Sequence, residues 1–234
     1  MRHGWEGVVL KLFRAKDFTF TVTGAVQVTE RYRRVHFTDG GLLEEIGVHP
    51  TMWVRLWFEN AGKPHQRAYT LVDPEVAAGT FSLEFALHDG CASDWSRKAE
   101  PGDTIEATVQ GTGFDIPDPL PPRMLVVGDP ASLPAINSLL AAAPELPATI
   151  WFETTHQADH ELPFRIADHH DLRTVPRPDL VANVKTGLRD LVTPDTFVWI
   201  ACDTTTTRTL TAYVLKDLAI PKHRVKSLGY WKAA

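Results

Sequence analysis

The chain has 234 residues, of which 44% are hydrophobic and 23% are charged, and its formal net charge is −5. These values are ordinary for a globular protein of one or two domains, and no apolar run approaches the roughly 18 residues of a membrane helix. Positive charge is not concentrated as in a nucleic-acid-binding protein, so that class is excluded. The two cysteines, Cys91 and Cys202, form no CxxC pair, which favours a reducing cytoplasm over a disulfide framework.

The first half of the chain reads mainly as strands. Apolar residues at helical spacing predict a helix over residues 5–13 that packs on the body of the protein. Strict alternation of apolar and polar residues predicts that the strand at 81–87 is half-buried. The sequence also predicts short helices at 40–47 and 93–99, and strands at 19–28, 31–38, 52–58, 65–72 and 104–109. Six strands with little helix favour a small antiparallel barrel or sandwich.

The pattern changes after residues 115–122, where prolines and aspartates predict a stiff connector between two domains, residues 1–120 and 121–234. Beyond the connector, wholly apolar strands alternate with helices. The expected strands are 124–129, 149–153, 172–175, 197–201 and 224–230, and the expected helices are 132–143, 183–191 and 205–218. This alternation predicts a parallel sheet covered by helices on both faces.

One strand carries three kinds of chemistry in four residues, Arg67-Ala68-Tyr69-Thr70. Arginine offers a charged, forked donor for phosphate, and tyrosine, two positions later on the same face, offers a planar ring. Threonine adds a hydroxyl within reach of whatever lies on that ring. These groups suit the anionic tail, planar head and polar edge of a flavin nucleotide, although any strand can carry such residues.

About twenty residues later, a strand ends at His88 and the chain turns at Gly90 into a helix that starts with small residues, Ala92 and Ser93. A helix start exposes free backbone N–H groups to an anion such as a diphosphate. Trp95 or His88 would then pack on a base. The alternative is an ordinary surface helix that Ser93 caps.

The first buried strand of the second half leads into the loop Gly128-Asp129, followed by Ser132 at the start of a helix. Ligands usually bind at this edge of a parallel sheet. The loop matches neither G-x-G-x-x-G nor a P-loop. Glu153 ends the next strand, where an acid accepts hydrogen bonds from a ribose 2′-hydroxyl and repels a 2′-phosphate. A nicotinamide donor would therefore be NADH rather than NADPH; the alternative is a solvated carboxylate.

Four histidines in a loop-rich region raise the question of a metal site: His156, His160, His169 and His170. No cysteine or ordered set of carboxylates completes a tetrahedral ligand pattern. Surface histidines are the better interpretation, and no protein-bound metal is predicted.

The order and spacing of the motifs resemble those of the siderophore-interacting proteins, flavin-dependent ferric-siderophore reductases of the ferredoxin-reductase-like superfamily. The shared marks are R-x-Y-T at 67–70, H-x-G-x-A-S-x-W at 88–95, P-G-D at 101–103, G-D-x-x-S-L-P-A at 128–135, W-I-A at 199–201 and G-Y-W-K at 229–232. The resemblance implies an amino-terminal antiparallel six-stranded β-barrel flavin domain, followed by a parallel-sheet α/β domain of the nicotinamide-binding type.

The resemblance also implies FAD as cofactor and a nicotinamide nucleotide as electron donor, for which Glu153 favours NADH. The residues expected around FAD are Arg67, Ala68, Tyr69, Thr70, His88, Gly90, Ala92, Ser93, Trp95 and Trp231. The nicotinamide side would use Gly128, Asp129, Ser132 and Glu153. A ferric siderophore, often anionic, would be attracted by Lys232 above all, with Arg55 and Arg208 as further candidates; the alternative for each is a solvated side chain.

Two departures from the family pattern concern cysteines. Cys91 replaces a common proline, and Cys202-Asp203 replaces a usual glycine-glutamate, which leaves the nicotinamide side open. The sequence therefore predicts a monomeric, cytoplasmic, NADH-dependent ferric-siderophore reductase. A flavoprotein fed by ferredoxin and a flavin-free protein that only binds siderophores are the alternatives.

Overall fold

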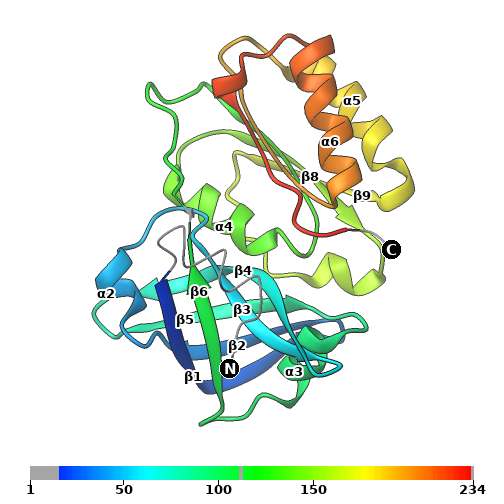
Figure 1. Cartoon of the computed structure of the whole chain (residues 1–234). Helices are drawn as coiled ribbons and strands as arrows, with labels where there is room; N and C mark the ends of the chain where they lie inside the picture. The colour runs from blue at the N-terminus through cyan, green and yellow to red at the C-terminus, as the bar shows by residue number, and fades with distance from the viewer. Residues whose placement is uncertain (1–15, 111–112, 233–234) are drawn as a thin grey trace. The chain divides into compact units, whose positions relative to one another are not determined.

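The computed structural model describes residues 16–110 and 113–232, and the chain divides into two compact units between Phe114 and Asp115 (Figure 1). The division falls at the first residue of the expected connector; the domain limits 1–120 and 121–234 stay a prediction. The helix expected at residues 5–13 lies outside the described residues. Within the described part of the chain, no helix is long and apolar enough to cross a membrane.

The first unit is a closed barrel of six antiparallel strands, which confirms the predicted six-stranded barrel. The spatial order of its strands is β1-β2-β5-β4-β3-β6. The strands are β1 (Lys16–Thr29), β2 (Tyr32–Thr38), β3 (Trp53–Asn60), β4 (Lys63–Glu75), β5 (Thr80–Ala86) and β6 (Thr104–Val109). Two short helices, α2 (Leu42–Ile46) and α3 (Cys91–Lys98), accompany them. Phenylalanines fill the barrel, and Trp95 of α3 packs against Phe37, Phe58 and Phe85 of this core.

Strand β5 differs from its expected half-buried form, because Ser82 and Glu84 on its polar face are buried as well. The Glu84 carboxylate accepts hydrogen bonds from the Tyr32 hydroxyl at 2.9 Å and from Arg34 Nε at 2.9 Å. A buried carboxylate is tolerated when it is paired and hydrogen-bonded. Alternation along β5 alone could not reveal these partners, which belong to β2.

Strand β4 has two different neighbours along its length. It pairs with β3 from Lys63 to Thr70, but with β5 only from Leu71 onward. Among the described residues, no strand pairs with the β5 side of residues 63–70. This part of β4 therefore has an open edge, from which a ligand can reach side chains on both of its faces.

The second unit is a five-stranded parallel sheet in the order β11-β10-β7-β8-β9. Its strands are β7 (Met124–Gly128), β8 (Ala148–Thr154), β9 (His170–Pro176), β10 (Phe197–Ala201) and β11 (Val225–Ser227). Helices α5 (Leu180–Leu191) and α6 (Thr204–Ala212) lie over one face and α4 (Leu133–Ala142) over the other (Figure 1). The strand order reverses between β7 and β10, where ligands usually bind in such sheets.

Two expected elements of this unit differ from the prediction, one in helix type and one in length. The helix expected at 205–218 changes after Ala212 into a π-helical turn, Tyr213–Asp217. The strand expected at 224–230 is β11, which ends at Ser227. Its continuation still follows β10, since Leu228 N–H donates to Ile200 O and Tyr230 N–H to Cys202 O, both at 2.9 Å.

Gly187 lies in the middle of α5, where alanine normally stabilises a helix by up to about 1 kcal/mol. A Cβ at this position would lie 2.5 Å from Trp151 Cζ2. We therefore expect Gly187→Ala to lower the free energy of unfolding by about 1–3 kcal/mol, through overpacking. Urea unfolding measures this, with the exposed Thr186→Ala in the same helix as control; a Gly187→Ala protein as stable as wild type would contradict the packing.

Candidate functional site

Arg67 and Tyr69 lie on the same face of β4, as their spacing predicts. Tyr69 is half-buried, and its ring packs against Phe85 and Phe58, with centroids 4.4 and 6.3 Å away. Burial raises the pKa of Tyr69 above its usual range, so the phenol stays neutral. Arg67 is exposed, and its Nη1 donates a hydrogen bond to the Gln66 carbonyl at 2.8 Å, which leaves the rest of the guanidinium accessible to an anion.

Thr70 lies on the opposite face of β4 from Tyr69, since adjacent residues of a strand alternate. Its expected contact with a ligand on the tyrosine ring stays a prediction. On its own face of β4, Thr70 lies opposite Trp53, Ala68 opposite Arg55, and Gln66 opposite Trp57. Three atoms there are buried and have no hydrogen-bond partner within the described ranges: Thr70 Oγ1, Arg55 Nη1 and Gln66 Nε2. They surround Ala68, which is exposed. We call Arg55, Gln66, Ala68 and Thr70 the Ala68 face.

The start of α3 lies near the motif strand, because Cys91 is close enough to Tyr69 to act on it electrostatically, and both pack on the barrel core. Gly90 precedes the helix with φ 145°, a conformation that favours glycine, and no side chain caps the first turn. Ser93, considered as a cap, is instead buried in that turn and accepts a hydrogen bond from His88 N–H at 3.1 Å. Among the described residues, no side chain therefore caps the N–H groups of this first turn.

These groups fit an FAD. Arg67 and the start of α3 suit its phosphates, and the unpartnered atoms of the Ala68 face suit a ring with polar edges, since each buried polar atom left alone costs about 1–3 kcal/mol. Trp95 packs on the barrel core. Its expected role near the adenine, like that of His88, stays a prediction.

In the second unit, Gly128 joins β7 to the loop before α4. A Cβ here would lie 2.5 Å from both Ser132 Oγ and Ile136 Cδ1, so only glycine lets the helix approach this closely. Asp129 is buried at the carboxyl end of β7. Its Oδ1 accepts a hydrogen bond from Ser132 N–H at 3.1 Å, and its Oδ2 accepts one from Trp231 Nε1 at 2.7 Å. Trp231, which the sequence predicts near the flavin, is thus hydrogen-bonded to Asp129, one of the residues predicted on the nicotinamide side.

Glu153 and Asp203 are buried at the ends of β8 and β10, and Arg177 binds both. Arg177 Nη1 lies 2.8 Å from Glu153 Oε1, and Arg177 Nη2 lies 3.4 Å from Asp203 Oδ2. The guanidinium also lies 4.8 Å from the centre of the Trp231 ring. Sequence reasoning missed Arg177, because it follows the third strand, β9, and only the sheet order brings it to the two acids.

The three carboxylates differ in their ionisation. Burial raises the pKa of Asp129 to about 6, against hydrogen bonds from Trp231 and Ser132. Burial, together with the charge of Asp129, raises the pKa of Glu153 to about 7. Burial would also raise the pKa of Asp203, but hydrogen bonds from Thr206 and Thr205 and the charge of Arg177 lower it overall. Three acids and one arginine make this edge unfavourable for a further phosphate charge.

The unusual Cys202-Asp203 pair has a local structural role. Asp203 caps α6, because its Oδ1 accepts hydrogen bonds from the N–H groups of Thr205 and Thr206 at 2.8 and 3.2 Å. Cys202 is fully buried, and burial raises the pKa of its thiol, which therefore stays protonated. Thr204 N–H donates to Trp231 O at 2.8 Å and holds that residue in place.

The three cations expected to attract a substrate differ in exposure and in the unit to which they belong. Arg208 and Lys232 are exposed in the second unit, whereas Arg55 is partly buried in the first. Neither unit by itself brings the three together.

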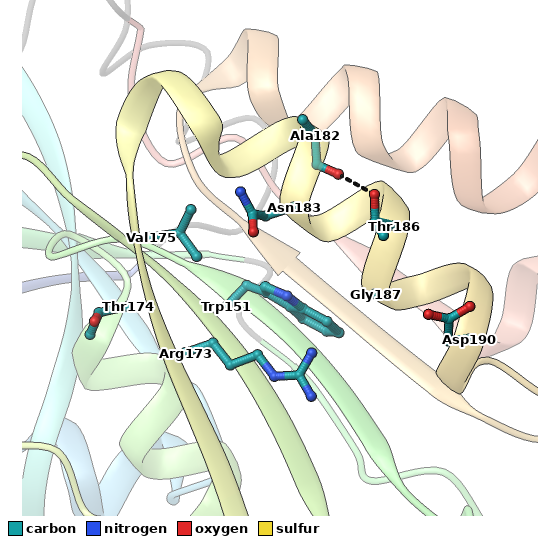
Figure 2. Close-up of a pocket in the computed structure, with 9 residues that line it drawn as sticks. All are labelled: Trp151, Arg173, Thr174, Val175, Ala182, Asn183, Thr186, Gly187 and Asp190. Atoms are coloured by element: carbon teal, nitrogen blue, oxygen red, sulfur yellow. Dashed lines mark hydrogen bonds between the residues drawn. The ribbon is translucent and has the colours of Figure 1, made fainter.

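A groove of about 480 Å³ lies between β9 and α5 (Figure 2). Arg173 lies over the ring of Trp151, 5.2 Å from its centre, but its Nη2 pairs with Asp171 at 2.6 Å. The groove contains none of the expected site residues, and its cation is already neutralised. The barrel strands β3 and β4 and the carboxyl edge of the sheet are therefore the better candidates.

Curated relatives match most or nearly all of the chain. It is 31% identical over 243 residues to the "Mycobactin import ATP-binding/permease protein IrtA" of Mycolicibacterium thermoresistibile, which covers 99% of this chain and 26% of that protein. It is 22% identical over 178 residues to the "NADPH-dependent ferric-chelate reductase" of Escherichia coli, covering 73% of this chain and 68% of the relative. The chain spans about a quarter of the length of the IrtA proteins it matches.

Solved structures share the fold. The siderophore-interacting protein from Acinetobacter baumannii superposes with a TM-score of 0.80 at 19% identity, over 94% of this chain and 91% of that chain. A ferredoxin NADP+ reductase from Neisseria gonorrhoeae, with bound FAD and NADP, superposes with a TM-score of 0.70 at 18% identity, over 92% and 99% of the two chains. The barrel and the parallel sheet thus form a ferredoxin-reductase-like fold.

Two family models match successive parts of the chain. Residues 43–109 match the siderophore-interacting FAD-binding domain, and this range contains the motif strand, the Ala68 face and α3. Residues 121–234 match the siderophore-interacting protein model, and this range contains the carboxylates gathered around Arg177. The chain belongs to the siderophore-interacting protein family.

Proposed function

We propose that this chain is an FAD-dependent oxidoreductase that reduces ferric siderophores with electrons from NADH. The observation that carries the proposal is the set of three buried, unpartnered polar atoms around Ala68, in the strand that bears the R-x-Y-T motif. Native proteins rarely bury polar atoms without partners, so such a cluster indicates a polar ligand. Its position within the segment that matches an FAD-binding domain supports FAD as that ligand.

FAD, when bound, supplies the ability to take up a hydride and to release electrons singly. The protein's part is to bind and orient. Arg67 and the first turn of α3 would hold the phosphates, since both offer positive charge to an anion. Tyr69, fixed by Phe58 and Phe85, would offer a planar surface, and Thr70 a hydroxyl for a polar ring edge.

The donor would bind at the carboxyl edge of the parallel sheet, where the strand order reverses. Asp129 and Glu153 would meet the nucleotide, and the surplus of carboxylates at this edge disfavours a 2′-phosphate. NADH is therefore preferred to NADPH in this proposal, unlike the E. coli relative, whose name gives NADPH.

The iron would arrive as substrate inside its chelator. Reduction of Fe(III) to Fe(II) weakens its binding to hard oxygen ligands, so the siderophore releases the metal. The exposed Arg208 and Lys232 would attract an anionic ferric siderophore.

A second candidate is the same reductase fed by a reduced ferredoxin. It is favoured by Trp231, which occupies the Asp129 carboxylate and lies against Arg177 at the edge where a nucleotide would bind. A ferredoxin needs no nucleotide crevice. Cys202 and Asp203, which replace the usual glycine-glutamate of the family pattern, lie at the same edge.

Anaerobic absorption spectra test the whole proposal. We expect the protein reconstituted with FAD to show the bands of a bound flavin, to lose them with NADH, and to regain them when a ferric siderophore is added, with Fe(II) trapped by a chelating dye. Bleaching by reduced ferredoxin but not by NADH would favour the second candidate. Failure to retain any FAD would overturn both.

Arg67 should contribute strongly to FAD affinity. We expect Arg67→Ala to raise the dissociation constant of FAD by about 10- to 100-fold, because a hydrogen bond to a charged group contributes about 1.5–3 kcal/mol. Quenching of flavin fluorescence on binding measures this. Arg31→Ala, which removes another exposed arginine of the barrel, is the control. Equal affinities for the two variants would remove Arg67 from the site.

Donor choice should depend on Glu153 and on pH. With a pKa of about 7, Glu153 is mostly protonated at pH 6 and ionised at pH 8, so the preference for NADH over NADPH should rise between these values. We expect Glu153→Gln to lower the ratio of the two kcat/KM values about tenfold at pH 8 and to flatten its rise. The exposed Glu145→Gln is the control. An unchanged ratio and pH profile in Glu153→Gln would exclude this role.

A further inference from the structure

Register places Arg55 on the face of β3 that points away from the barrel core. Val54, Leu56 and Phe58 of the same strand are core residues, so the alternate residues Trp53, Arg55 and Trp57 face outward. Residues directly opposite in an antiparallel pair share a face. Arg55 therefore shares the outward face with Ala68, its partner on β4, and with Gln66 and Thr70 on either side of Ala68.

The guanidinium of Arg55 leans toward the Thr70 side of this face. Its Cζ lies 4.5 Å from the centre of the Trp53 ring, and Trp53 is the register partner of Thr70. The guanidinium and the unpartnered Thr70 hydroxyl thus lie toward the same end of the Ala68 face. Trp53 supplies a flat support for the cation, which fixes its position without neutralising its charge.

Arg55 lacks an acidic partner of the kind that Arg34 and Arg97 of the same unit have. Arg34 pairs with Glu84 and Arg97 with Asp94, whereas Arg55 makes no ion pair with any residue in 16–110 or 113–232. The acid in the same register row is Asp17, across β6 from Arg55. Its Oδ1 accepts a hydrogen bond from Thr108 Oγ1 at 2.7 Å, and that hydroxyl in turn accepts one from Trp57 Nε1 at 2.8 Å.

A partly buried cation without a counter-ion is costly, and burial here lowers the pKa of the Arg55 guanidinium. The sequence suggested that Arg55 attracts the substrate, as Arg208 and Lys232 would. Those two are exposed, whereas Arg55 is fixed on Trp53 with Nη1 buried. A cation that is fixed and partly buried in this way is suited to contact a bound ligand in a site shielded from water.

We propose that Arg55 belongs to the flavin site and stabilises the negative charge that two-electron reduction adds to the bound ring, and that Gln66 is a second donor on the same face. The inference rests on the proposed function. A hydride from a nicotinamide nucleotide brings two electrons and one proton, so the ring gains one negative charge and the donor leaves as oxidised nicotinamide. A fixed cation nearby favours the reduced form over the oxidised one.

The experiment compares the two-electron midpoint potential of FAD bound to full-length wild type, Arg55→Gln, Arg55→Lys and the control Arg33→Gln. Arg33 is a barrel arginine that also has a buried unpartnered nitrogen, Nε, but it lies on β2. We expect Arg55→Gln to weaken the binding of reduced FAD about tenfold more than that of oxidised FAD, which lowers the potential by about 30 mV. Arg55→Lys should keep most of the wild-type potential, and Arg33→Gln all of it.

A second variant covers the case in which Arg55→Gln does not fold, as judged by circular dichroism. Gln66→Glu is nearly isosteric and places a negative charge on the same face, so it should lower the potential as well. Equal weakening of reduced and oxidised FAD, or the same shift in Arg33→Gln, would overturn the assignment of Arg55 and leave the reductase proposal standing. A wild-type protein that retains no FAD would overturn both.

Discussion

The register between β3 and β4 is the constraint on which the flavin half of the molecule depends. Because side chains alternate along a strand, a slip of one residue would exchange the set that faces the core with the set that faces a ligand. The register is fixed at one end by the two-residue turn Ala61-Gly62, where both residues have positive φ, 49° and 73°. It is fixed along the strand by Val54, Leu56 and Phe58, which must enter the core.

This register divides the motif strand between two tasks. Tyr69 is packed on Phe85, whereas Ala68 and Thr70 lie on the same face of the sheet as Arg55. The two sets can serve one ligand because β5 joins β4 only from Leu71. The second unit brings its site residues together in a different way. In a parallel sheet the carboxyl ends of the strands meet at one edge, and Arg177 forms ion pairs with two of the acids found there.

Period and turn chemistry were enough to predict a strand-rich unit followed by a parallel sheet, since strand β5 alternates in sequence and the central strands β7 and β10 are apolar throughout. The choice of a barrel over a sandwich came from the family resemblance. They failed where partners come from distant parts of the chain. Glu84 is buried because Tyr32 and Arg34 reach it from another strand, and Arg177 meets Glu153 only through the sheet order. Asp129 and Glu153 were predictable because strand order alone places them. The face on which Thr70 lies, and the lack of an acid beside Arg55 among the described residues, could be seen only from the pairing of β3 with its neighbouring strands.

The hydrogen bond between Trp231 and Asp129 joins residues 102 positions apart, nearly the full span of the second unit. Contacts of such long sequence separation form late, because a long loop must close first. During synthesis, β7 and its loop leave the ribosome long before residue 231 is made. The acidic edge therefore stays unfinished, with the Asp129 carboxylate still open to water, until the rest of the unit has been translated.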